Sequence, residues 1–191
     1  MIPSKKTLDD RYRQNFPLSF RGSSVTNQIA VSALNNLEKA IKLVEDKISG
    51  CEEIILDLFG GLTSQVTGAI NYDIGAEKGI RGDVSQLLEI FPPNSVSEII
   101  ASGPQAFFLE QAAIILKSGG RIYINANRSN PFAKLPDADT LSRLRLRVIL
   151  ENGNLEPRFA NQQFFRQIPR LDGSYNIPLA TIRTTILEKE A

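Results

Sequence analysis

Apolar positions recur along the chain at helical spacing in one segment and in short runs elsewhere. From Ser32 onward, apolar residues recur at steps of three and four, and Gly50 follows the last of them. This spacing predicts one amphipathic helix that ends at the glycine. The apolar positions are Ala33, Leu34, Leu37, Ala40, Ile41, Val44 and Ile48.

After Gly50 the pattern changes to short apolar runs of the kind that form strands. The first, "EIILDL", is β-branched and nearly continuous, which is typical of a strand buried on both faces. The predicted strands are "EIILDL", "GAINYDI", "VSEIIAS", "GRIYINA", "LRVILENG" and "TIRTTILEK". Predicted helices lie within "QAFFLEQAAIILKSGG", ended by Gly119 and Gly120, and at the start of "DADTLSRLRL". Strands that alternate with helices predict an α/β fold with a parallel sheet.

The ends of this pattern set the expected domain organisation. Residues 1–30 are polar without a sustained period, which predicts an N-terminal arm with at most a short helix. Residues 31–191 are expected to form a single α/β domain, which is large enough to bury a core. An insertion rich in Phe, Arg and Pro is expected at about 154–180, and we prefer a hairpin with one apolar face as its interpretation.

The composition removes several kinds of chemistry. The chain has 22 basic and 21 acidic residues, no histidine and one cysteine, Cys51. An intrachain disulfide, a multi-cysteine metal site and imidazole catalysis are therefore excluded, and we expect Cys51 to be a small buried or half-buried residue. No apolar run is long enough for a membrane span or a signal peptide, so we expect a cytoplasmic protein that does not contact a membrane.

Two acids and a glycine pair stand where an open parallel sheet binds ligands, beyond the carboxyl ends of its strands. "FGG" follows the first strand, and Asp73 ends the second. A carboxylate there can accept hydrogen bonds from two ribose hydroxyls, and glycines let backbone amides approach a ligand. Asp83 can accept from an exocyclic amine such as that of adenine. Ordinary turn chemistry is the competing interpretation of both acids.

The order of these segments resembles the class I S-adenosylmethionine-dependent methyltransferase fold, in the variant with a very short first loop. The resemblance runs from Glu53 to about Ala126, and "AAIILKSGGRIYI" is its most specific part, with Ser118 where the family usually has proline. It implies a Rossmann-like, doubly wound, mostly parallel sheet of about seven strands. The last strand would be antiparallel, helices would lie on both faces, and S-adenosylmethionine would be the cofactor.

Carried across by position, the family's cofactor site falls on the strand ends. Asp73 would hold the ribose, Asp83 would border the adenine, and Ser102 would lie near the transferred methyl group. The implied cofactor-binding residues are Asp57, Phe59, Gly60, Gly61, Asp73, Ile74, Asp83, Val84, Ser102 and Gly103. Phe59 departs from the family because it takes the first glycine position of the loop. The sixteen-residue spacing from Asp57 to Asp73 also leaves little room for a helix.

Two functions remain open from the sequence. One is a methyltransferase with an unidentified acceptor and no catalytic residue that the sequence singles out. The other is a methyltransferase-like module that binds no cofactor and acts on nucleic acid or protein. The segments are also similar to C-terminal toxin domains of large bacterial secreted proteins, which implies delivery into another cell and an immunity protein.

Nucleic acid is a further partner that the sequence suggests. Arginines can contact phosphates, although a solvated helix or strand edge explains them equally well. The candidate phosphate-binding residues are Arg143, Arg145, Arg147, Arg158 and Arg166.

Overall fold

A seven-stranded sheet organises the part of the chain that the computed structural model describes, residues 37–167 and 174–191. The predicted arm, residues 1–30, lies outside the described residues. Residues 37–49 are helical. The strands are β1 (Ile55–Leu58), β2 (Ile70–Asp73), β3 (Ile80–Arg81), β4 (Val96–Ser102), β5 (Leu116–Asn127), β6 (Leu146–Asn154), β7 (Phe165–Gln167), β8 (Ser174–Asn176) and β9 (Ile182–Lys189). The helices are η1 (Val84–Gln86), α3 (Leu87–Ile90), α4 (Leu109–Ile115), η2 (Pro131–Ala133), α5 (Ala138–Arg143), η3 (Pro157–Phe159) and η4 (Leu179–Thr181).

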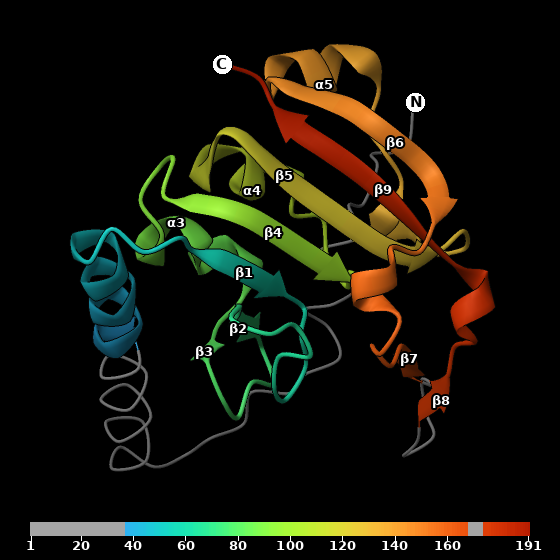
Figure 1. Cartoon of the computed structure of the whole chain (residues 1–191), viewed down its shortest axis with the longest axis horizontal. Helices are drawn as coiled ribbons and strands as arrows, with labels where there is room; N and C mark the ends of the chain where they lie inside the picture. Colours follow the sequence, from blue (N-terminus) through green and yellow to red (C-terminus); the bar gives the residue numbers. More distant parts are fainter. Residues whose placement is uncertain (1–36, 168–173) are drawn as a thin grey trace, which may run out of the picture. The chain divides into compact units, whose positions relative to one another are not determined.

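The strand order confirms the predicted fold class. The sheet runs β3-β2-β1-β4-β5-β9-β6 (Figure 1). Strands β1 to β5 are parallel to one another, whereas β9 is antiparallel to both β5 and β6. The chain proceeds from β1 outward to β2 and β3, and then crosses back to β4 on the other side of β1. The boundary between β1 and β4 is therefore the switch point of a doubly wound sheet.

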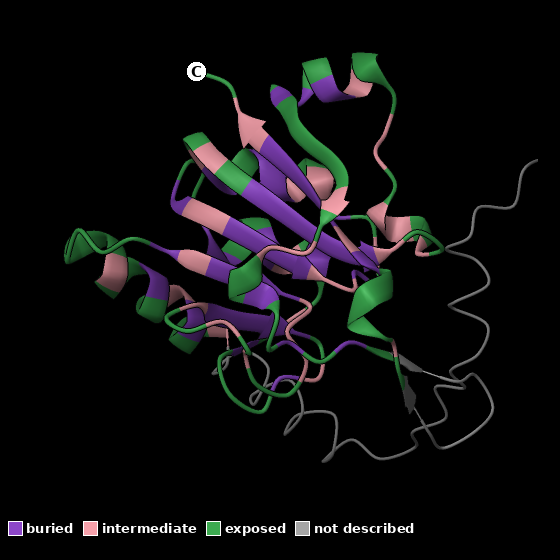
Figure 2. Cartoon of the chain, turned by 45° about the vertical axis from the view of Figure 1, so that its right-hand side comes forward, coloured by how far each residue is buried: buried purple, intermediate pink, exposed green. Residues whose placement is uncertain are grey.

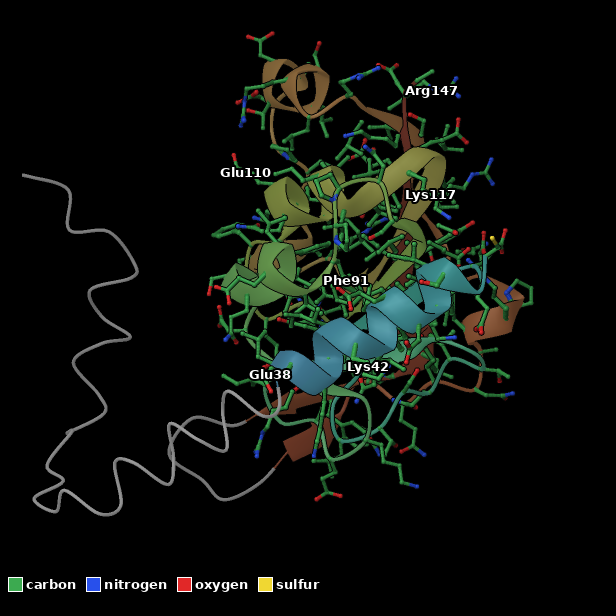
Figure 3. The ribbon with its side chains drawn as sticks, turned by 90° about the vertical axis from the view of Figure 1, so that its left-hand side faces the viewer. Glu38, Lys42, Phe91, Glu110, Lys117 and Arg147 are labelled. Atoms are coloured by element: carbon green, nitrogen blue, oxygen red, sulfur yellow. The ribbon has the colours of Figure 1, made fainter. Side chains whose placement is uncertain are left out.

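The two faces of the sheet are covered unequally. Buried residues gather in the strands of the sheet, and the loops around it are largely exposed (Figure 2). Buried residues of helix 37–49, α3, α4 and α5 all belong to one large apolar cluster with one face of the sheet. Ala40 and Val44 are the buried residues of helix 37–49, whereas Glu38 and Lys42 are exposed (Figure 3). The opposite face has a smaller cluster, in which η3 contributes Phe159. Among the described residues, no helix is long and apolar enough to cross a membrane.

The first two connections contain no helix. Residues 59–69 join β1 to β2, and residues 74–79 join β2 to β3. The first connection, hereafter the first loop, has the short form that the spacing from Asp57 to Asp73 predicted. Both connections are held by backbone hydrogen bonds, because the Leu62 carbonyl accepts from the Glu77 amide at 2.9 Å and the Lys78 amide at 3.1 Å.

Three local predictions require correction. Cys51 is exposed rather than buried, because it lies in the turn after helix 37–49 with a φ of 55°. Helix α4 begins at Leu109 rather than near Gln105, since the preceding residues form the loop that leaves β4. It ends at Ile115 rather than at Gly119 and Gly120, because β5 already begins at Leu116. The sequence pattern also missed β3, which is two residues long and buries only Ile80.

The first residues of β5 give a test of the fold. An added Cβ at Gly120 would lie 2.8 Å from the Ser97 carbonyl oxygen and 2.9 Å from the Lys117 carbonyl oxygen. Backbone atoms cannot rotate away, so we expect Gly120→Ala to lower the free energy of unfolding by about 1–3 kcal/mol in urea titrations. Ser118→Ala, at an exposed position near the start of the same strand, is the control and should change the free energy of unfolding by less than about 0.5 kcal/mol. Equal stability of the two variants would contradict this packing.

Candidate functional site

The carboxyl ends of β1, β2 and β4 bring several predicted site residues to one edge of the sheet. Asp57 is the third residue of β1, while Asp73 and Ser102 are the last residues of β2 and β4. Because β2, β1 and β4 are adjacent, these side chains and the first loop occupy neighbouring positions. The strand order therefore confirms the prediction that these residues share one edge of the sheet.

At its start, the backbone of the first loop is left-handed at two of three successive residues. Phe59 has a φ of 68° and Gly61 a φ of 75°, and these are the positions of the two glycines in the family's loop. A left-handed conformation costs a non-glycine residue about 1–2 kcal/mol. The Phe59 ring packs edge to face against buried Phe108 at 5.6 Å, which offsets that cost. The phenyl group thus lies against the core while the backbone keeps the turn expected of glycine.

Gly60 lies directly over two buried polar side chains. Asp57 and Asn71 are partners in the parallel pairing of β1 and β2, so their side chains share one face. An added Cβ at Gly60 would lie 2.6 Å from Asp57 Oδ2 and would also collide with Asn71 Oδ1. Glycine is therefore required here by close approach.

Asp57 and Asn71 together leave two acceptor oxygens without a partner. Asp57 is fully buried, and its Oδ2 accepts from the Ser64 hydroxyl at 2.7 Å. Asn71 Nδ2 donates to the Gly61 carbonyl at 2.9 Å and to the Lys78 carbonyl at 2.8 Å. Asp57 Oδ1 and Asn71 Oδ1 have no hydrogen bond. Burial raises the pKa of Asp57, although the Ser64 hydrogen bond acts in the opposite direction. A protonated Asp57 would supply the donor that this pair lacks.

Asp73 joins the first loop to the β2–β3 connection. Its Oδ2 accepts from the Gly61 amide at 3.1 Å, and its Oδ1 accepts from the Gly75 amide at 2.7 Å. An ionised carboxylate offers about four acceptor sites, so acceptor capacity remains on both oxygens. The next residue, Ile74, leaves the sheet with 69% of its surface exposed.

Asp83 begins a short helix. Its carboxylate accepts from the Ser85 amide at 2.9 Å, and its own amide donates to Gln86 Oε1 at 3.1 Å, which forms a capping box at η1. Its neighbour Val84 is buried. The Asp83 side chain therefore serves as a helix cap in this structure, and its contact with adenine stays a prediction.

Ser102 and Gly103 connect the edge to a buried polar network. The Ser102 hydroxyl donates to Gln162 Oε1 at 3.0 Å, and the Gly103 amide donates to the Asn125 carbonyl at 2.7 Å. Thr184 donates to Asn125 Oδ1 at 2.7 Å. Gln162, Asn125 and Thr184 are all buried. The network therefore fastens the segment after η3 to the end of β4.

A second attachment joins that segment to the first loop. The Gln163 amide donates to Gln65 Oε1 at 2.7 Å, and Gln65 Nε2 donates to the Gln163 carbonyl at 3.2 Å. Together with the Ser102 contact, this pair holds the segment beside the carboxyl edge of β1 and β4. Sequence reasoning missed both glutamines as well as Asn71. The only signal for Asn71 was its place on the same strand face as Asp73.

Most of the arginines proposed for phosphate contact are paired with carboxylates. Arg143 contacts Glu110 at 2.8 Å, and Arg147 contacts Glu188 at 2.7 Å. Arg158 contacts Glu98 at 2.8 Å and Glu156 at 3.1 Å. Arg145, with a φ of 57°, directly precedes β6, and the Arg166 side chain lies outside what the structure describes. A phosphate-binding role for this group stays a prediction.

Comparison with known proteins gives similarity to solved structures alone. No protein-family model and no curated sequence matches the chain. The chain is similar to a TehB-like SAM-dependent methyltransferase from Corynebacterium glutamicum, with 14% identity, 88% of this chain and 100% of that chain covered, and a TM-score of 0.43. It is also similar to magnesium protoporphyrin IX methyltransferase from Synechocystis, with 11% identity, coverage of 95% and 91%, and a TM-score of 0.37. The assignment of the fold rests on the order and direction of the strands described above.

The buried Asp57 gives a pH test of the site. A folded pKa above the ordinary value of 3.8 stabilises the fold below that pH, and this contribution is lost as pH rises through the folded pKa. Asp57→Asn cannot ionise, and its amide can donate to Asn71. We therefore expect the stability of the variant relative to the wild type to increase as pH rises above about 4, measured by urea titrations up to pH 8.

The control for this experiment is Asp46→Asn. Asp46 is exposed and pairs with Lys42 at 2.9 Å. The difference in the free energy of unfolding between Asp46→Asn and the wild type should therefore lack the pH dependence that a buried acid produces. If the stability of Asp57→Asn runs parallel to that of the wild type at every pH, the proposed state of Asp57 is wrong.

Proposed function

We propose that this chain is an S-adenosylmethionine-dependent methyltransferase that acts on an acceptor not yet identified. The observation that best supports the proposal is the conformation of the first loop at the switch point. Positions 59 and 61 are both left-handed, and the Gly61 amide lies 3.1 Å from the carboxylate of Asp73. This arrangement puts a glycine-rich backbone and an acid together where doubly wound sheets bind nucleotides.

The residues at this edge fit the cofactor. Asp73 keeps acceptor capacity for the ribose hydroxyls, since each of its oxygens accepts one amide. Gly60 and Gly61 present backbone without side chains, and exposed Ile74 offers an apolar contact beside the ribose. Asp57 is fully buried, so its role in this proposal is to support the loop from beneath.

The chain itself needs little reactive chemistry for methyl transfer. The bound cofactor supplies an electrophilic methyl group. Alignment of the acceptor and exclusion of water then provide most of the acceleration. Ser102 and Gln162 would contribute to both, because their hydrogen bond holds the segment after η3 at the edge. An amine that loses its proton easily needs no histidine base, and the chain has none.

Calorimetric titration with S-adenosylmethionine and S-adenosylhomocysteine tests this proposal. We expect micromolar binding, on the order of −8 kcal/mol. Asp73→Ala should abolish binding because the ribose loses its acceptor. Asp73→Asn keeps the shape of the side chain and should only weaken binding. Asp46→Ala, at an exposed position of helix 37–49 and outside the strand ends, is the matched control and should bind like the wild type.

Thermal melting of each variant checks that it is folded, since Asp73 also accepts two loop amides. A folded wild-type protein that gives no heat with either ligand at millimolar concentration would overturn the proposed function.

The second candidate is a methyltransferase-like module that binds no cofactor. The observation in its favour is that the Asp73 oxygens already accept from Gly61 and Gly75, as in an ordinary structural cap. Such a module would act by contact with nucleic acid or protein, for which a toxin domain with an immunity protein is one form. Growth arrest on expression of the chain in bacteria, with no heat in the titration above, would favour this candidate.

A further inference from the structure

Strand β6 is a long free edge of the sheet. It is the last strand in the sheet order, and within the described residues it pairs with β9 alone (Figure 1). The opposite edge is β3, which is two residues long and ends in exposed Arg81. A short, charged edge resists pairing with another chain, whereas the nine residues of β6 offer a row of backbone groups. An intermolecular strand contact is therefore expected at β6 rather than at β3.

The middle of β6 is both exposed and apolar. Six successive residues, 147–152, are exposed, whereas a strand with one packed face would alternate (Figure 2). Val148, Ile149 and Leu150 are 37%, 40% and 37% exposed. Ile149 has no partner on β9, because the pairing shifts register between Val148 and Leu150. Three successive exposed apolar residues on a free edge indicate a surface that another strand covers.

Charges of opposite sign lie at equal distances from this apolar centre. Arg147 lies two residues before Ile149, and Glu151 lies two residues after it. Glu151 is exposed and forms no ion pair with another described residue. Arg147 contacts Glu188 at 2.7 Å, but its side chain is 60% exposed (Figure 3). Glu188 also contacts Arg121 at 3.0 Å, so Arg147 can turn to a second acid without leaving Glu188 unpaired.

We propose that β6 pairs in the antiparallel direction with β6 of a second copy of this chain, centred on Ile149. A twofold axis at Ile149 brings Arg147 of each copy near Glu151 of the other, so that two pairs of opposite charge form. The apolar centres then cover each other. A pair centred on Arg147 or on Glu151 would instead bring like charges together, which is destabilising. The order of charges thus selects a second copy and one register.

The pairing closes at two copies. Both copies use the same strand, so the paired sheet ends in β3 on either side and offers no second long edge. The register of β6 on β9 also shifts between Leu150 and Gly153, and such a bulge bends the rest of the strand away. The contact therefore centres on residues 147–151. A standard interface buries about 800 Å² per partner, more than so short a contact offers, so we expect a micromolar dissociation constant.

Sedimentation velocity of the purified chain at about 1 to 100 μM tests the pairing. We expect the wild type to shift from monomer to dimer over this range. Ile149→Lys should stay monomeric, because it places two cations together at the twofold axis. Leu88→Lys changes another exposed apolar side chain, 45% exposed, on α3, and it should associate like the wild type. Thermal melting checks that each variant is folded.

A charge exchange tests the register. Arg147→Glu and Glu151→Arg should each weaken self-association about tenfold or more, because like charges then meet across the axis. An equal mixture of the two variants should associate again, since one copy carries two acids and the other two arginines at these positions. A variant that merely damages the fold would not be restored by mixing.

Several results would overturn this inference. A wild-type chain that stays monomeric at 100 μM would do so, including when another protein covers this edge in place of a second copy. A dimer that survives Ile149→Lys, or a mixture that associates no better than its separate variants, would also contradict it. These results are independent of cofactor binding, because β4, β5 and β9 separate β6 from β1 in the sheet order.

Discussion

Two buried polar side chains, Asp57 and Asn71, lie side by side beneath the first loop, and the shape of the carboxyl edge depends on their hydrogen bonds. Asn71 holds the loop and the β2–β3 connection by donating to the carbonyls of Gly61 and Lys78. Gly60 must lack a side chain because it crosses directly over the pair. A buried polar group without a partner costs about 1–3 kcal/mol, so this loop cannot rearrange without a penalty. The pair therefore fixes the backbone that faces Asp73.

The second face of the sheet is organised by polar contacts in place of a full layer of helices. The network of Ser102, Asn125, Thr184 and Gln162 runs from β4 through β5 to β9 and ends on the segment after η3. Arg158 adds to this cover, since its guanidinium lies 4.1 Å from the centre of the Tyr123 ring. The short first loop explains the arrangement, because no helix between β1 and β2 is present to cover this face. The inserted segment takes that place and also borders the candidate site.

The sequence predicted the parts of the fold that depend on local pattern. The bounds of β4 matched the quoted run, and the short apolar or alternating runs located β1, β2, β5, β6 and β9. The position of Asp73 at a strand end also followed from its pattern. The pairing of Gln65 with Gln163 was not predictable, because the two residues are 98 positions apart and a glutamine carries no periodic signal.

Other features escaped prediction for physical reasons. Asn71 interrupts an apolar strand without any sign of what it contacts. The left-handed turn at Phe59 was hidden because this conformation is expected of glycine. The exposure of Phe107 beside buried Phe108 depends on how one loop leaves β4. Such details come from tertiary contacts that no local pattern contains.

Nitrogen–proton NMR spectra of the labelled protein, recorded as S-adenosylhomocysteine is added, test the central claim that this edge is a nucleoside-binding site. We expect the amide signals of Gly60, Gly61, Gly75 and Ile74 to shift first and to saturate together, while the signals of Ser118 and Gly119 near the start of β5 stay unchanged. No shift at saturating ligand, or shifts confined to residues outside the carboxyl edge of β1 and β2, would contradict it.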